Sequence, residues 1–355
     1  MNKLLSSLNF PAFPARLSIY TLGHFYFEFM ANYFLVAVIG PHLTSYTQMV
    51  HVLVIYNCFD YGCQIFIGLC DDIVHRNHFF AAIGAFLFAI AYFFHASAFI
   101  AAAVIGLGAA FIHVPLGRQV LSEKPERYAY LAPFVASGAF GVFLGKETGF
   151  GHLIIHWPLA LGAAAVFFIL CTLGRHESSW NAATEEKTSA LLLQPSLSCL
   201  VSIALLVSAI AVQSFTFAIL QFTWDISWIA WISAIAILLS KGSGGLLADR
   251  FGYERTIIAS TLVALLCAAW APTHAALGIV FLLAIHIPSA TVIVRLAHRL
   301  GPAIGTGFGL FKLFHLLGFL PTLFFPGSYF LSPLLLIVLT LITGILMLIE
   351  NRIGR

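Results

Sequence analysis

Apolar runs about as long as a bilayer is thick recur along this sequence, separated by short polar segments. Because a helix needs roughly 20 apolar residues to cross the hydrocarbon core, each run is a candidate membrane span. Twelve such runs lie at about 17–40, 46–70, 78–95, 97–117, 128–147, 152–173, 197–221, 226–247, 255–271, 275–295, 305–326 and 329–349. Only 9% of the residues are charged, whereas soluble domains contain about 25%. The sequence therefore predicts an all-α membrane protein with twelve transmembrane helices.

Lysine and arginine are distributed unevenly between the predicted loops. Loops on one side, such as 41–45 and 271–275, contain neither residue. The termini and the loops on their side contain Lys3, Arg16, Arg76, Arg118, Lys124, Arg127, Arg175, Lys187, Arg250, Arg255, Arg295, Arg299, Arg352 and Arg355. By the positive-inside rule we expect both termini to be cytoplasmic, in a multi-pass protein of the plasma (inner) membrane.

The predicted helices divide into two halves. Residues 174–196 form the one long polar stretch, which predicts a cytoplasmic linker between an N-terminal six-helix bundle, 1–173, and a C-terminal one, 197–355. An offset of 177 residues aligns the halves without a gap, pairing Gly68 with Gly245, Asp72 with Asp249 and Arg118 with Arg295. Such a pattern indicates parallel repeats related by an axis along the membrane normal.

The segment 241–255, KGSGGLLADRFGYER, is a charged turn between two apolar runs. It contains the pattern G-x-L-x-D-R-x-G-x-x-R, formed by Gly245, Leu247, Asp249, Arg250, Gly252 and Arg255. This pattern resembles the cytoplasmic loop signature of major facilitator superfamily transporters. We expect Asp249 to cap the N-terminus of the next helix, and the arginines to pair with acids or lipid phosphates. We interpret Gly68, Asp72, Gly245, Asp249, Arg250, Arg255, Arg118 and Arg295 as a cytoplasmic gate.

Further motifs lie in the first, fourth and fifth spans. The first reads GHFYFEFMANYFLVAVIGPHL, with His24 four residues before Glu28; the fourth ends GLGAAFIHVPLGR, and the fifth contains GAFGVFLGKETG. Together they resemble the fosmidomycin-resistance branch of the superfamily, which are proton-driven drug exporters. Gly141 and Gly145 resemble the antiporter signature of such proteins, with Lys146 in place of its proline. The resemblance implies proton-coupled export of a small amphipathic compound by alternating access.

Ionisable groups inside predicted spans mark candidate transport residues, because burying one in a bilayer costs roughly 3 kcal/mol. Helical spacing places Glu28 on one face with Thr21, His24 and Asn32, and Asp60 on one face with Asn57 and Gln64. We assign proton coupling to Glu28, Asp60 and His24, and the substrate cavity to Asn32, Asn57, Gln64, His113, Lys312 and His315. The alternative for each acid and histidine is a packing role or a structural ion pair.

Two other lysines lie inside predicted spans. Lys146 and Lys241 are near enough to the span ends for their ammonium groups to reach the membrane surface. By contrast, Lys312 lies deep in its span and requires an acid or an anionic substrate. We therefore expect Lys312 alone of the three to face the cavity.

Several function classes lack their motifs in this sequence. It has no G-x-x-x-x-G-K-[ST] nucleotide loop and no hydrolase or zincin motif, and its six cysteines have no metal or redox spacing. We therefore expect a monomeric secondary transporter, not an enzyme, with no cofactor or metal, whose partners are protons, a small-molecule substrate and lipid, and no nucleic acid. Export is favoured. The alternatives are proton-coupled uptake of a small polar nutrient or organic anion, and a non-transporting membrane protein.

Overall fold

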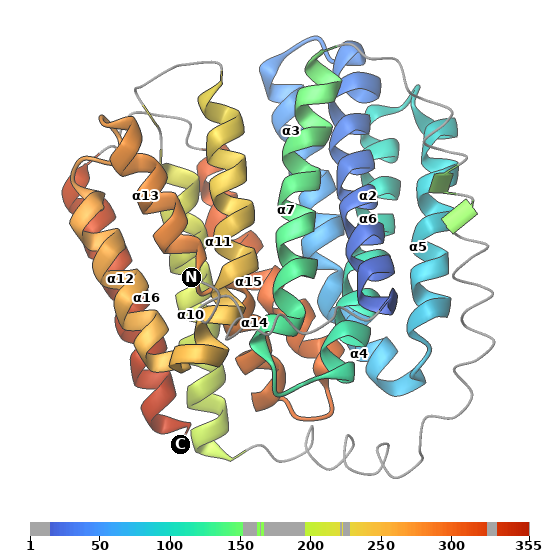
Figure 1. Ribbon diagram of the computed structural model, residues 1–355. Coiled ribbons are helices and arrows are strands. Elements are labelled where there is room, and N and C mark those ends of the chain that lie inside the picture. The colour runs from blue at the N-terminus through green and yellow to red at the C-terminus, as the bar shows by residue number, and fades with distance from the viewer. Residues whose placement is uncertain are drawn as a thin grey trace, which may run out of the picture.

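The structure is a computed structural model, which describes residues 15–151, 196–220, 228–324 and 332–354, together with residues 162, 163, 165, 166 and 222. Every regular element in this part of the chain is helical (Figure 1). The helices are α2 (Ala15–Tyr33), α3 (Tyr46–Asn57), α4 (Gln64–Val74), α5 (Asn77–Ala91), α6 (Ala98–Glu123), α7 (Tyr128–Phe150), α10 (Leu197–Ile219), α11 (Ile229–Phe251), α12 (Tyr253–Ala268), α13 (Ala275–His286), α14 (Ser289–Arg299), α15 (Ile304–Phe324) and α16 (Pro333–Ile353).

Ten helical stretches within these residues are long and apolar enough to cross a membrane. They coincide with predicted spans, from Leu17–His42 for the first to Pro333–Ile353 for the last. The span predicted at 255–271 is occupied by α12, a helix of 16 residues. The predicted sixth span, 152–173, and the linker, 174–196, lie almost entirely outside the described residues. The all-helical fold class is confirmed, while twelve spans and two six-helix bundles stay predictions.

The helices gather into two groups, with α2–α7 on one side of the molecule and α10–α16 on the other (Figure 1). The first group packs around buried aromatic side chains such as Phe27, Phe88 and Phe134. The second packs around residues such as Leu206 and Ile257. Between the groups, α11 packs along α7 and α15 packs along α4. These two helix pairs form the contact on which the candidate site is built.

Two predicted spans of the first group contain π-helical turns, which accommodate one extra residue within a helix. One turn, Phe34–Ile39, follows α2, and the other, Cys58–Gly62, joins α3 to α4. The second turn contains Asp60, whose side chain is 1% exposed. Because a π turn changes which side chains share a helix face, it lets Asp60 contact His113 of α6.

Candidate functional site

A group of buried polar side chains in mutual contact connects α2, the π turn Cys58–Gly62 and α6. His113 is at its centre and bridges two carboxylates: its Nε2 lies 2.9 Å from Glu28 Oε1 and its Nδ1 lies 3.0 Å from Asp60 Oδ1. All three side chains are at most 5% exposed. An imidazole that donates from both nitrogens carries a positive charge, so this arrangement can hold a proton between two acids. These residues lie in three separate predicted spans, and the structure brings them together.

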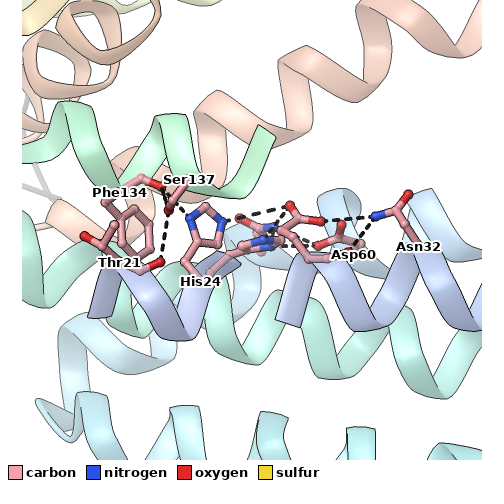
Figure 2. A network of polar contacts seen from close by, with 9 residues as sticks. Thr21, His24, Asn32, Asp60, Phe134 and Ser137 are labelled. Atoms are coloured by element: carbon pink, nitrogen blue, oxygen red, sulfur yellow. Dashed lines mark hydrogen bonds and ion pairs between the residues drawn. The ribbon is translucent and has the colours of Figure 1, made fainter. Parts of the chain in front are cut away.

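Amide side chains contact both acids, and Figure 2 shows Asn32 at one end of the group. Gln64 donates to Asp60 Oδ1 at 3.0 Å, and Asn32 donates to Glu28 Oε2 at 3.5 Å. These two predicted cavity residues therefore contact the acids. Asn57 does not, since its amide donates to the carbonyl of Leu53 in its own helix at 2.7 Å.

His24 is held in place by α7. Its Nδ1 donates to the Phe134 carbonyl at 2.6 Å, and its ring stacks on the Phe134 ring with centroids 4.1 Å apart (Figure 2). A Cβ atom on Gly138 would collide with the imidazole, so the glycine leaves space for this ring. The other nitrogen, Nε2, is buried and lies 3.9 Å from Glu28 Oε1, and it has no hydrogen-bond partner among the described residues. His24 therefore presents a nitrogen lone pair toward Glu28.

Next to this group of side chains is a cavity of about 400 Å³ between the two helix groups. Its volume suits a small-molecule ligand. It is lined by His24, Glu28, Tyr61, Val135, Gly138, Ala139, Val142, Phe143, Lys146, Gln213, Ser214, Phe217, Ala230, Ser233, Ala234, Ile237, Lys241, His286, Ser289, Ile293, Phe308, Phe311, Lys312 and His315. His113, Asp60, Asn32 and Gln64 lie behind Glu28 and are not part of this lining.

Three lysines face this cavity, from α7, α11 and α15. Lys312 and His315 are part of its lining. The expectation for Lys146 and Lys241 was wrong, because both line the cavity as well. Position along a span indicates depth, but the face toward the cavity depends on how the helix packs. Lys312 Nζ lies 4.5 Å from the centre of the Tyr61 ring, and within the described residues no carboxylate is within 4.0 Å of it.

Asp72, at the end of α4, contacts the first residues of α15. Its carboxylate accepts the backbone N–H groups of Gly305 at 2.8 Å and Thr306 at 2.7 Å. It is also paired with Arg118, whose Nε is 2.8 Å from Oδ1. Gly68, one turn earlier, lies against the Gly305 backbone, where a Cβ atom would collide. This contact joins the two helix groups.

Asp249, at the end of α11, makes the related contact with α7. Its two oxygens accept the backbone N–H groups of Tyr128 at 3.0 Å and Ala129 at 3.1 Å, and Gly245 lies against the Tyr128 backbone. The predicted cap on the following helix was wrong: α12 has no side-chain cap. The carboxylate instead caps a helix of the other half, where its charge also favours the N-terminus.

The two contacts are related by the 177-residue offset. Adding 177 to the number of Asp72 gives Asp249, and adding 177 to the number of Tyr128 gives Gly305. An offset found in the sequence therefore also relates contacts in space, with the two halves exchanged, as a twofold relation between repeats requires.

The arginines of the predicted gate have different surroundings. Arg118 binds Asp72, and it also donates to Asn77 Oδ1 at 2.6 Å. Arg295 binds not Asp249 but Glu350, with Nε 2.7 Å from Oε2, and Arg299 binds the same carboxylate at 2.9 Å. By contrast, Arg250 and Arg255 are exposed, and neither has a carboxylate within 4.0 Å among the described residues.

Glu350 is a site residue that sequence reasoning missed. It is 0% exposed and also accepts a hydrogen bond from Ser202 at 2.7 Å. Its position near the end of α16, two residues before Arg352, is typical of a surface acid. No pattern in the sequence indicates the two arginines of α14 as its partners.

The fold is similar to that of solved transporters. The crystal structure of the major facilitator superfamily transporter FucP in the outward conformation matches with a TM-score of 0.67 and 14% identity, over 97% of this chain and 99% of that chain. A single-residue variant of FucP, the fucose:proton symporter of E. coli, matches with a TM-score of 0.67 and 13% identity, over 97% of this chain and 100% of that chain. No protein-family model and no curated protein matches the sequence. The chain thus has the fold of major facilitator superfamily transporters and is an integral, multi-pass membrane protein.

Proposed function

We propose that this protein is a secondary transporter that moves a small organic anion together with protons by alternating access. The observation that carries the proposal is the lining of the cavity, where Lys146, Lys241 and Lys312 face a space with one carboxylate, Glu28, among the described residues. Ammonium groups that face a cavity within the membrane need a counter-charge. A carboxylate or phosphate on the substrate would supply it.

The same arrangement sets the direction of coupling. Protonation of Glu28 removes the negative charge nearest the lysines, so an anion binds more strongly when the proton is present. By linkage, the proton then also binds more strongly when the anion is present. Cooperative binding of this kind moves both species in the same direction, which favours symport and hence uptake. FucP, described as a fucose:proton symporter, is similar in fold to this chain.

Proton-driven export, as in the fosmidomycin-resistance branch, is the second candidate. One observation favours it: the glycines of the antiporter-like motif lie directly against α2. A Cβ atom on Gly141 would be 2.5 Å from the Phe25 carbonyl oxygen, and one on Gly145 would collide with the Phe29 carbonyl. Export would require the substrate to compete with the proton at Glu28, which suits a cationic or neutral compound.

The contacts of Asp72 and Asp249 lie at the first residues of α15 and α7. They support a role for this end of the helices as the cytoplasmic gate between bundles 1–173 and 197–355. With both carboxylates bound across the two groups, the helices are held together at this end, so the cavity would be accessible from the outer side. Opening the gate to the cytoplasm requires both contacts to break.

Transport measurements can separate the two candidates. The purified chain in liposomes would be tested with a panel of small organic anions and cations, while the internal pH is recorded with a trapped dye. Symport predicts that adding an external anion acidifies the lumen. Alkalinisation of the lumen by an external substrate would instead establish antiport. A panel of transported compounds that includes no anion would overturn the proposal.

We expect Lys241→Gln to raise the KM for the anion about tenfold, since loss of one charged contact costs about 1.4 kcal/mol. The measurement is initial uptake by liposomes over a range of substrate concentrations. Arg352→Gln removes an exposed cation outside the cavity and the predicted gate, and it serves as the control. An equal change in both variants would show that general surface charge, and not the cavity lysine, is responsible.

We expect Asp249→Asn to shift the protein toward the state open to the cytoplasm. The variant weakens two charge-assisted hydrogen bonds to α7, which would change the ratio of the two states about tenfold for a loss of 1.4 kcal/mol. Spin labels at Glu126→Cys and Leu197→Cys, both exposed positions on opposite helix groups, would report the change as a longer distance in a background without other cysteines. The variant Asp249→Glu, which keeps the charge, should shift the distribution less. No lengthening in Asp249→Asn would contradict the gate.

A further inference from the structure

Three potential metal ligands converge beside the cavity, with His24 and Glu28 in its lining and His113 behind them. The ligand atoms offered by His24, Glu28 and His113 all lie within 4.8 Å of one another, and all three residues are buried. Bonds of about 2.0–2.2 Å from one ion would place tetrahedral ligand atoms roughly 3.3–3.5 Å apart. The observed separations from Glu28 Oε1, 2.9 Å to His113 and 3.9 Å to His24, bracket that value. Small side-chain rotations are therefore enough to surround an ion.

The outer partners of both histidines are those of metal ligands. In protein metal sites, the ring nitrogen that does not bind the ion usually donates to a carboxylate or a backbone carbonyl. His113 Nδ1 is bound to Asp60, and His24 Nδ1 is bound to the Phe134 carbonyl. Each imidazole thereby directs Nε2 toward Glu28 (Figure 2 shows His24 with Asp60 and Phe134). The orientation of the rings is thus set from outside the cluster.

Contacts among the described residues satisfy both ring nitrogens of His113, but only one ring nitrogen of His24. The nitrogens of His113 lie within hydrogen-bonding distance of both carboxylates. By contrast, the buried Nε2 of His24 has no hydrogen-bond partner in the part of the chain that the structure describes. A buried nitrogen without a partner costs about 1–3 kcal/mol. The His24 residue is 5% exposed, and its ligand atom lies within 4.8 Å of the two others. An ion at the centre of the cluster would satisfy it.

The charges of the cluster balance with a divalent cation. Glu28 and Asp60 contribute two negative charges, and two neutral histidines contribute none, so a divalent ion leaves no net buried charge. Imidazole nitrogens favour Zn²⁺ and similar transition metals, whereas Mg²⁺ and Ca²⁺ prefer oxygen ligands.

We propose that His24, Glu28 and His113 form a binding site for a divalent transition-metal ion of the Zn²⁺ class, with Asp60 and the Phe134 carbonyl as outer partners. Three protein ligands leave one position open toward the cavity. The ion and the coupling proton compete for Glu28, so Zn²⁺ inhibits proton-coupled transport. Binding itself does not depend on the proposed transport function.

The test is a titration of the purified full-length chain with Zn²⁺, in detergent and without a histidine tag. We expect one equivalent to bind, with displacement of protons and no competition from Mg²⁺ or Ca²⁺. His24→Gln and Glu28→Gln should each weaken binding at least about 100-fold, and Asp60→Asn about tenfold. His51→Gln, which removes an exposed histidine of α3, should leave binding unchanged. Binding that is equally strong in His24→Gln and Glu28→Gln would place the ion elsewhere and overturn the proposal.

The absorption spectrum of bound Co²⁺ is a second readout. It is measured on the wild-type protein, so it does not require any variant to fold. A four-coordinate nitrogen and oxygen site gives Co²⁺ intense visible absorption, and Zn²⁺ should abolish it. The weak spectrum of hydrated Co²⁺, with no change on adding protein, would also overturn the proposal. Transport assays in liposomes with a metal chelator test the transport function separately, so failure of one proposal does not imply failure of the other.

Discussion

Glu28→Gln is expected to abolish proton-driven accumulation of the substrate while leaving exchange of substrate across the membrane intact. The amide resembles a permanently protonated carboxyl, so the cavity still binds the anion but cannot release a proton. With one proton per anion and a gradient of two pH units, the wild type can accumulate substrate about 100-fold, since each tenfold ratio corresponds to 1.4 kcal/mol. The variant should reach a ratio of about one. The measurement compares accumulation with counterflow in the same liposomes.

Glu126→Gln is the matched control, because it removes an exposed carboxylate from the loop between α6 and α7. It should accumulate substrate as the wild type does. Undiminished accumulation by Glu28→Gln would show that the proton is carried elsewhere, with Asp60 as the next residue to replace. Loss of both accumulation and counterflow would show that Glu28 is needed for substrate binding or folding, and not only for coupling.

Glu350→Ala is expected to lower the free energy of unfolding by about 3 kcal/mol. The substitution leaves Arg295 and Arg299 without their shared carboxylate, and removing one partner of a buried ion pair costs about 3–5 kcal/mol. We take the lower end of that range because the side chain of Arg299 is 22% exposed. The measurement is thermal unfolding in detergent, followed by intrinsic fluorescence.

Glu350→Gln tests whether charge or hydrogen bonding is responsible. It can still accept from Ser202 and one arginine, so it should destabilise the protein less than Glu350→Ala. The triple variant that also replaces Arg295 and Arg299 by Gln should recover part of the loss, because no buried charge is then unpaired. Unchanged unfolding in Glu350→Ala would show that water reaches the two arginines.

The helical architecture was predictable because it depends on local properties of the sequence. The length and apolarity of each run determine where a helix can cross a membrane, and ten of the predicted spans are present in the described residues. The His24 and Glu28 spacing also predicted a shared helix face, and the side chains are 3.9 Å apart. Similarly, the offset between the halves identified Asp72 and Asp249 as equivalent positions.

The partners of those residues were not predictable, since they come from helices distant in sequence. His113 joins Glu28 to Asp60 only because α6 packs against both α2 and the π turn. Asp249 reaches Tyr128, 121 residues earlier in the chain, instead of the helix that follows it. Such contacts depend on the packing of whole helices, which leaves no periodic signal in any one segment.

The sequence by itself determined that the chain is a membrane protein with helical spans, because the length and apolarity of a run are properties of a single segment. Only the tertiary structure decided which charged groups share the cavity. Lys146 and Lys241 face it together with Lys312 because of the way α7, α11 and α15 are rotated against one another. The rotation of a helix about its axis is set by its neighbours, and these helices carry polar and apolar residues on all sides.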